Sequence, residues 1–585
     1  MKRLLTIMLA LTMFSCDNTP EPTPAGGLSL SRDEVTVAHD ERRTSVTVRS
    51  NVDWTLSVTE GADWITPGLD HGAAGSTIEI DFTLATNTGD RQRRGTVAIE
   101  GEGGRHIFTI IQNPENTLSG VNKWIYETMT RAYYWNDVVK DTPPPPNDLP
   151  YDEFLKTLIQ DLEWARVQDT SNGENPATID GDWTAAFLAS GQRRSTDEND
   201  RENIYSYIER TPTNAPATRA FGSRMTIFGF GFEQFWVDDN GLREFLVTYV
   251  QPGTPADEAG MKRGMWITQY NGADIYYDQY YEFFYRLHYL EGGNTLSFSD
   301  ASGKPYFLTA ADSPNNPILH HSVITTAKGT KVGYLVYNEF YPGDSNEFDD
   351  QLRDIFGEFL NAGATELVLD LRYNRGGRVS SARVLASLAG DVRSTQVFEK
   401  NLFNPEYARE NGRENPQSTY FYNEPNSIGL RKIYLLATNG SASASESIIS
   451  SLRGVDIEVV HIGDTTSGKN VGMSTFSATF DGYSYNLLPI TFKGLDANDF
   501  TDYAGGFRPT VYRNEFYNMM YGLDYVHNFG DPKEYLLEGA LTMIDGGTLT
   551  PDPTTRLAPS GTRKLMPAPR DPRHGLRIYT HEEER

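Results

Sequence analysis

Serine and lysine side chains stand at two places in this 585-residue chain where the local pattern favours nucleophilic chemistry. The apolar run 433–436 predicts a buried strand, and apolar residues at helical spacing after Glu446 predict a helix. Between them lies Ser441-Ala-Ser-Ala-Ser445, a turn of small residues in which a hydroxyl can be exposed as a nucleophile. Backbone N–H groups at a helix start also favour developing negative charge.

Ser443 is the serine of this turn that stands at the predicted helix start. Ser443-Ala-Ser-Glu446 fits the capping-box pattern, in which the serine hydroxyl bonds to the first turn of the helix. This stretch alone is therefore compatible with a helix cap and with a nucleophile.

Lys469 follows a second predicted strand. The apolar run 459–462 predicts a buried strand, and Asp464–Gly472 is the loop after it. A lysine beside a buried strand end can be desolvated, and desolvation allows an amine to act as a base. The alternative is a solvated loop lysine, the common state of this residue.

These two stretches together carry a family resemblance. Ser-Ala-Ser-Ala-Ser-Glu followed by Thr-x-Gly-Lys resembles the C-terminal processing peptidases, or tail-specific proteases, which are serine peptidases with a Ser/Lys dyad. The resemblance implies that Ser443 is the nucleophile and Lys469 the general base. Met473 stands where the family often has a glutamine that helps to orient the lysine.

A second motif of the same family lies upstream. Residues 366–372 predict a buried strand, and Asp370-Leu-Arg-Tyr-Asn-Arg-Gly-Gly377 is similar to the family's Asp-Leu-Arg-x-Asn-x-Gly-Gly. The resemblance implies an oxyanion hole formed by the N–H of Gly376 or Gly377 with that of Ala444. Arg375 stands where small residues or proline are usual. Without the resemblance, the two glycines would be an ordinary turn.

Composition narrows the class of protein. The formal charge is 52 − 79 = −27, which argues against nucleic acid as a partner. One cysteine excludes an intramolecular disulfide. The ten histidines show no H-E-x-x-H spacing, so we expect no metal and no cofactor.

The N-terminus has the pattern of an export signal. Residues 1–16 combine a basic start, a short apolar run and a small residue before Cys16. Phe-Ser-Cys resembles a bacterial lipobox, which implies a Bacteroidetes-type lipoprotein lipidated at Cys16, with 17–27 as a linker. We therefore expect a cell-envelope protein, periplasm-facing or on the outer-membrane surface. Cleavage near Ser15 with an unmodified Cys16 is the alternative.

Residues 28–113 show all-β alternation with recurring turn signals, which suits a β-sandwich. Asn51-Val-Asp-Trp54, Trp64-Ile65 and Asn87-Thr-Gly-Asp-Arg91 resemble a BACON domain, which implies an immunoglobulin-like sandwich and contact with glycans. The alternative is a spacer that binds nothing. We expect Trp54 and Trp64 to be core residues rather than a ligand platform.

Two further segments precede the peptidase motifs. Residues 117–211 show helical spacing and resemble the helical cap of some tail-specific proteases. Residues 212–312 resemble a PDZ domain, with Met265 where an aspartate is usual. Its carboxylate-binding loop would include Phe230, Gly231 and Phe232, whose backbone would hold a peptide C-terminus while the sheet edge adds the peptide as a strand. The alternative is a rigid lid.

Residues 313–547 alternate predicted strands and helices, and the resemblance implies a crotonase-like α/β core. The tail 548–585 is rich in proline and charge, which predicts disorder. We expect a multidomain, lipid-anchored serine endopeptidase acting on protein substrates. The alternatives are an inactive peptidase fold that binds peptide or glycan, and a hydrolase of another acyl substrate.

Overall fold

The computed structural model describes residues 27–89, 92–102, 104–113, 118–141, 143–161, 206–213, 224–238, 240–288, 294–516, 526–553, 564–565 and 577–580. The predicted signal peptide with Cys16, and all of the linker except its last residue, lie outside these ranges. The chain divides into two compact units, Met1–Ser119 with Pro143–Leu149 and Gly120–Thr142 with Pro150–Arg585. Within the described ranges, no helix is long and apolar enough to cross a membrane.

The first unit contains a sandwich of two β-sheets. One sheet has the order β1-β3-β7-β5 and the other β2-β9-β8-β4-β6. Alternate residues of the strands fill one core, in which Trp54 is 2% and Trp64 6% exposed. Both tryptophans are therefore core residues, as predicted. The strands are β1 (Leu28–Leu30), β2 (Glu34–Val37), β3 (Arg43–Ser50), β4 (Trp54–Glu60), β5 (Ile65–Pro67), β6 (His71–Gly72), β7 (Ser76–Leu84), β8 (Arg93–Gly101) and β9 (Gly104–Gln112).

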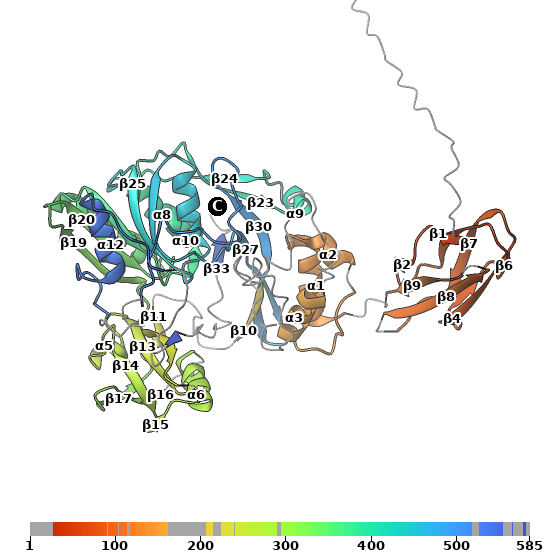
Figure 1. Cartoon of the computed structure of the whole chain (residues 1–585), viewed down its shortest axis with the longest axis horizontal. Coiled ribbons are helices and arrows are strands. Elements are labelled where there is room, and N and C mark those ends of the chain that lie inside the picture. The colour runs from red at the N-terminus through yellow and green to blue at the C-terminus, as the bar shows by residue number, and fades with distance from the viewer. Residues whose placement is uncertain are drawn as a thin grey trace, which may run out of the picture. The chain divides into compact units, whose positions relative to one another are not determined.

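A six-stranded sheet, β19-β20-β21-β25-β26-β31, is the centre of the second unit (Figure 1). From β20 onward the strands are parallel. Helices α7, α8 and α10 pack on one face and α12 on the other, so alternate residues of each strand enter different cores. Both faces are buried, which explains the unbroken apolar runs of these strands. The elements are β19 (Ile318–Thr325), β20 (Lys331–Tyr337), α7 (Glu347–Ala362), β21 (Glu366–Asp370), α8 (Val379–Ala389), β25 (Lys432–Ala437), α10 (Ala444–Arg453), β26 (Glu458–Gly463), β31 (Val511–Tyr512) and α12 (Tyr535–Ile544).

A second six-stranded sheet, β22-β33-β27-β30-β23-β24, contains a strand from the tail that the sequence predicted to be disordered. Tail strand β32 joins the sheet of the PDZ-like segment. The composition of the tail argues only against a core of its own, whereas main-chain pairing with an existing strand needs no such core. The strands are β22 (Gly376–Arg378), β23 (Val397–Phe403), β24 (Gln417–Tyr420), β27 (Val471–Ser474), β30 (Ile490–Leu495), β32 (Lys564–Leu565) and β33 (Arg577–Thr580), and helix α9 (Pro405–Glu410) follows β23.

The segment predicted to be helical ends in a strand. Helices α1 (Gly120–Ala132), α2 (Asn136–Asp141) and α3 (Tyr151–Asp161) follow the predicted periodicity. Strand β10 (Tyr207–Pro212) instead pairs with β29 (Tyr483–Leu488), which pairs with β28 (Phe476–Phe480). Pairing with a strand nearly three hundred residues later along the chain overrides the local helical pattern in this segment.

The PDZ-like segment forms the sheet β17-β16-β14-β13-β12-β32, with β15 beside β14. Phe228 and Phe230 are buried in its core, and Phe232 packs against that core. Phe230, Gly231 and Phe232 therefore lie at the start of strand β12, which pairs with β32 at Phe235 and Trp236, and the phenylalanine rings pack inward. The remaining elements are β11 (Arg224–Ile227), β12 (Phe230–Trp236), β13 (Arg243–Val250), α5 (Pro255–Glu258), β14 (Trp266–Tyr270), β15 (Ala273–Asp274), α6 (Tyr277–His288), β16 (Thr295–Asp300), β17 (Pro305–Thr309) and β18 (Ala311–Pro314).

Candidate active site

Ser443 occupies the turn between strand β25 and helix α10. It is the N-cap of the helix, with φ 62° and ψ −118°. A positive φ at a residue other than glycine costs about 1–3 kcal/mol and persists where the surrounding structure imposes it, often at functional sites. A strained turn between a strand and a helix is also the arrangement that exposes catalytic serines at the edge of a sheet.

The hydroxyls of the three serines in this turn differ in their partners. Ser441 Oγ donates to the carbonyl of Leu371 at 2.7 Å, and Ser445 Oγ donates to the carbonyl of Asn374 at 2.8 Å. Ser443 has the placement of a capping-box serine, yet its buried Oγ makes no hydrogen bond to any described residue. Among the three, only the Ser443 hydroxyl is left available for chemistry.

Glu446 connects the serine turn, residues 441–445, to the lysine loop, residues 464–470, between strands β26 and β27. Its Oε2 accepts the N–H groups of Ser443 at 2.8 Å and Lys469 at 2.9 Å. Its Oε1 accepts the Thr466 hydroxyl at 2.6 Å and the Gly468 N–H at 2.7 Å. Burial raises the pKa of this carboxyl, and the four donors oppose that shift by favouring the ionised form. One buried carboxylate thus sets the spacing between the backbones of Ser443 and Lys469.

Lys469 is fully buried, at 0% exposure, in the loop between β26 and β27. Burial of an amine disfavours its charged form, which is the condition under which a lysine can act as a base. The preceding Gly468 has φ +92°, and a Cβ there would lie 2.2 Å from the carbonyl oxygen of Ala504, so glycine is required. Met473 is also fully buried, in strand β27.

The two candidate oxyanion glycines have different surroundings. The N–H of Gly376 donates to Asn374 Oδ1 at 2.9 Å and is thereby occupied. Gly377 has φ +134°, and a Cβ there would lie 2.3 Å from the carbonyl oxygen of Phe340. Ala444, the other predicted donor, is the first residue of helix α10 and fully buried. Gly377 is therefore the better candidate of the two glycines.

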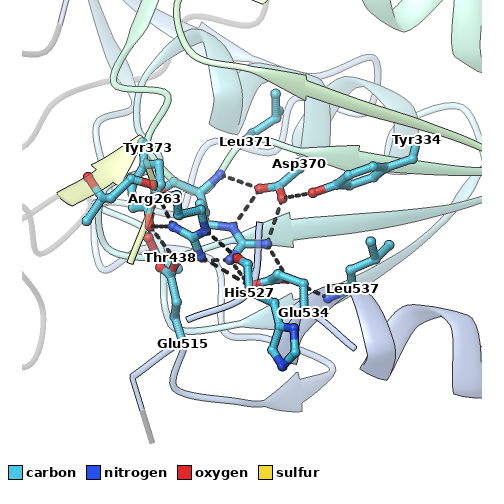
Figure 2. A network of polar contacts seen from close by, with 12 residues as sticks. Arg263, Tyr334, Asp370, Leu371, Tyr373, Thr438, Glu515, His527, Glu534 and Leu537 are labelled. Carbon is cyan, nitrogen blue, oxygen red and sulfur yellow. Dashed lines mark hydrogen bonds and ion pairs between the residues drawn. The ribbon is translucent and has the colours of Figure 1, made fainter. Parts of the chain in front are cut away.

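A buried ionic network surrounds Asp370 at the end of strand β21 (Figure 2). Arg372, at 0% exposure, forms two hydrogen bonds with Asp370 at 2.9 and 2.7 Å and two with Glu534 at 2.7 and 2.9 Å. Arg372 also reaches Glu515 at 3.0 Å. Burial would raise the pKa of Glu534, but the charge and hydrogen bonds of Arg372 lower it to about 2. The end of strand β21, before the loop 371–375 that leads to the candidate oxyanion glycines, is therefore held by charge-assisted bonds.

The same network includes a residue of the PDZ-like segment. Arg263 forms ion pairs with Glu515 and with Glu534, and donates to the Tyr373 hydroxyl at 2.8 Å. The Tyr373 hydroxyl in turn donates to Glu515. Sequence reasoning missed Arg263, Glu515 and Glu534, because residues so far apart along the chain carry no local signal of a shared site. Asn374 and Glu446, by contrast, lie inside the quoted motifs.

His461 is a buried histidine close to the site. Burial lowers its pKa to about 4, and its Nε2 lies 3.0 Å from the carbonyl oxygen of Ala437 at the end of β25. The neutral ring must donate from Nε2 in this contact. His461 therefore positions the strand that leads into the serine turn.

Three segments of the chain match models of known protein families. Residues 331–493 match the model for Peptidase family S41, and residues 120–169 match that for the Peptidase S41 N-terminal domain. Residues 52–113 match the BACON model, an N-terminal domain credited with a binding role. No curated protein matches the chain.

Two solved structures illustrate the likeness. A protein of Bacteroides fragilis classed as an S41 protease is 26% identical, with a TM-score of 0.50, and the alignment covers 72% of this chain and 97% of that one. The photosystem II D1 C-terminal processing protease is 17% identical, with a TM-score of 0.38 and coverage of 67% and 92%. The chain thus carries an S41 peptidase domain with its N-terminal segment and a BACON domain, and it is a serine-type peptidase.

Proposed function

We propose that the chain is an endopeptidase in which Ser443 is the nucleophile, Lys469 the general base, and the N–H groups of Gly377 and Ala444 the oxyanion hole. The main support for this assignment is the hydrogen bonding of the three serine hydroxyls in the turn. The hydroxyls of Ser441 and Ser445 are committed to backbone carbonyls, whereas the buried Ser443 hydroxyl is not.

The chemistry follows from this assignment. The Ser443 Oγ transfers its proton to the neutral Lys469 amine and attacks a peptide carbonyl carbon. The developing oxyanion accepts hydrogen bonds from Gly377 and Ala444, donors commonly worth about 3 kcal/mol each. The lysine then protonates the leaving amine, and water releases the acyl group from Ser443 by the reverse sequence.

Four variants test the dyad against its alternatives. Ser443→Ala and Lys469→Ala should abolish single-turnover cleavage of a casein-derived peptide while circular dichroism stays unchanged. Ser441→Ala loses two hydrogen bonds and Ser445→Ala loses one, each worth about 1 kcal/mol, and both variants should keep measurable activity. Full activity of Ser443→Ala beside an inactive Ser441→Ala or Ser445→Ala would show that the nucleophile is misassigned. Inactivity of every protein, wild type included, would favour the binding-protein alternative.

Substrate selection through a C-terminus is a further part of the proposal. Strand β12 begins at Phe230, beside the loop at Gly229, whose φ is +86°, and its outer side pairs with β32 at Phe235 and Trp236. We expect a peptide with a free apolar C-terminus to bind more tightly than its amidated form, as measured by calorimetry. Equal affinity for the two peptides would rule out carboxylate recognition by this loop.

Membrane anchoring and glycan contact complete the proposal. The N-terminal pattern that ends at Cys16 supports lipidation in the cell envelope. Cys16→Ala should move the protein from the membrane fraction to the soluble fraction, and an unchanged distribution would refute the anchor. The BACON domain supports glycan contact, which binding to a mucin-glycan array would test, and an array with no bound glycan would leave the domain as a spacer.

A further inference from the structure

The space between strands β22 and β27 is filled by main chain from the tail. Strand β22 contains the candidate oxyanion glycines, and β27 begins two residues after Lys469. Strand β33 lies between them and runs parallel to both, with Ile578 opposite Gly377 and Tyr579 opposite Met473. An extended segment of the chain itself therefore lies between two strands of the proposed active site.

The backbone of β22 indicates which tail carbonyl faces the site. On one side of β22, Phe340 donates its N–H to the carbonyl of Gly376 and accepts the N–H of Arg378. The N–H and carbonyl of Gly377 must therefore point to the other side, toward β33. In a parallel ladder, an N–H on that side faces the carbonyl that precedes its register partner. The Gly377 N–H thus faces the carbonyl of Arg577, where the carbonyl of a bound substrate would lie.

The tail also pairs with the second edge that could receive a peptide. Strand β32 runs antiparallel to β12, with Leu565 opposite Phe235. Strand β12 starts at the candidate carboxylate loop, so its edge is where a PDZ-like segment would add a peptide strand. Two strands of one tail thus occupy both candidate peptide edges of this unit.

We propose that residues 577–580 are an intramolecular occupant of the peptide groove, and that substrates enter by displacing them and pairing in the same place. The substrate class is then an extended peptide whose free N–H and carbonyl groups pair in parallel with β22 and β27. The naming of the groove as a substrate site rests on the proposed function. A tethered segment competes at an effective concentration in the millimolar range, so external peptides at micromolar concentration bind poorly while it is present.

The test compares four forms of the protein. They are the full chain, a chain that ends at Pro553, the variant Tyr579→Pro, and the control Glu583→Pro, which changes the tail outside β33. Proline at 579 removes the N–H that faces the Gly377 carbonyl. With a fluorogenic casein-derived peptide, we expect KM to fall at least tenfold in the shortened chain and in Tyr579→Pro, and to stay unchanged in Glu583→Pro. A synthetic peptide of residues 570–585 should inhibit the shortened chain competitively. Equal KM values in all four forms would overturn the proposal.

A binding measurement separates this inference from the catalytic assignment. The same forms are made with Ser443→Ala, and the fluorescence anisotropy of the labelled casein-derived peptide gives Kd without turnover. Tighter binding by the shortened chain and by Tyr579→Pro supports the occupied groove, even if no form of the protein cleaves and the peptidase assignment fails. Binding no tighter than that of the full chain overturns the proposal, even if every form with Ser443 is active.

Discussion

Glu446 offers the sharpest test of how the serine and the lysine are held together. Its two oxygens accept four hydrogen bonds, one pair at Oε2 from Ser443 and Lys469 and one pair at Oε1 from Thr466 and Gly468. A glutamine keeps the shape but replaces one oxygen with an NH₂ group, which cannot accept a hydrogen bond.

The partners decide where that NH₂ group goes. At Oε2 both partners are backbone N–H groups, so an NH₂ there would face two donors. At Oε1 the Thr466 hydroxyl, which also accepts the Phe507 N–H, can turn and accept from the NH₂ group, so the Gly468 N–H and the Thr466 O–H both lose this acceptor. One buried donor left without a partner costs about 1–3 kcal/mol. We therefore expect Glu446→Gln to lower the free energy of unfolding by about 2 kcal/mol, and Glu446→Ala, which loses all four bonds, by roughly twice that or more.

Urea denaturation gives the stability, and steady-state kinetics give the effect on the site. We expect kcat to fall more than KM rises, because the carboxylate contacts the backbones of the proposed nucleophile and base rather than the substrate. The matched control is Glu458→Gln at the start of β26, where a glutamate that is 60% exposed pairs with Lys432. This surface pair is worth at most about 1 kcal/mol. Unchanged stability and unchanged kcat in Glu446→Gln would refute the inference that Glu446 holds the serine turn and the lysine loop together.

Three other predictions follow from the same contacts. Gly377→Ala places a Cβ 2.3 Å from the Phe340 carbonyl oxygen at a φ of +134°, so kcat should fall about 100-fold or more with secondary structure retained by circular dichroism. Burial would raise the pKa of Glu534, but Arg372 lowers it from 4.5 to about 2. The resulting contribution of about 3 kcal/mol to the free energy of unfolding is present above pH 4.5 and is lost as the pH falls toward 2. Glu534→Gln should therefore flatten that part of an acid-denaturation curve. Burial lowers the pKa of His461 from 6.5 to about 4, so its contribution to stability is full above pH 6.5 and falls between pH 6.5 and 4. His461→Gln should remove this pH dependence, and equal wild-type stability at pH 7 and pH 5 would contradict the prediction.

The central sheet and the candidate site could be predicted because the signals were local. Strands β20, β21, β25 and β26 are buried on both faces, so each appears in the sequence as an apolar run. The carboxyl ends of parallel strands meet at one edge of a sheet, where α/β proteins place their ligands. The loops that follow β21, β25 and β26 carry Gly377, Ser443 and Lys469, and the structure places these loops on neighbouring strands.

The rest could not be predicted, because it depends on partners distant along the chain. The pairing of β33 with β22 and β27 uses main-chain groups, which every residue possesses, so four residues of a polar tail leave no pattern to detect. The ionic network likewise joins Arg263, Arg372 and Glu534 from three separate segments. A buried arginine at 0% exposure requires carboxylates around it, but the sequence does not say which ones.

The alternating serines of the motif gain a structural explanation from their partners. Ser441 donates to the carbonyl of Leu371 and Ser445 to that of Asn374, so the two flanking hydroxyls hold the turn against the loop that leads to Gly376 and Gly377. Glu446, the residue after the motif, ties the same turn to the lysine loop. If Ser441 or Ser445 acted as a nucleophile, its hydroxyl would have to give up the hydrogen bond to Leu371 or Asn374. The middle serine is held by its neighbours on both sides, and its own hydroxyl is not needed to hold anything.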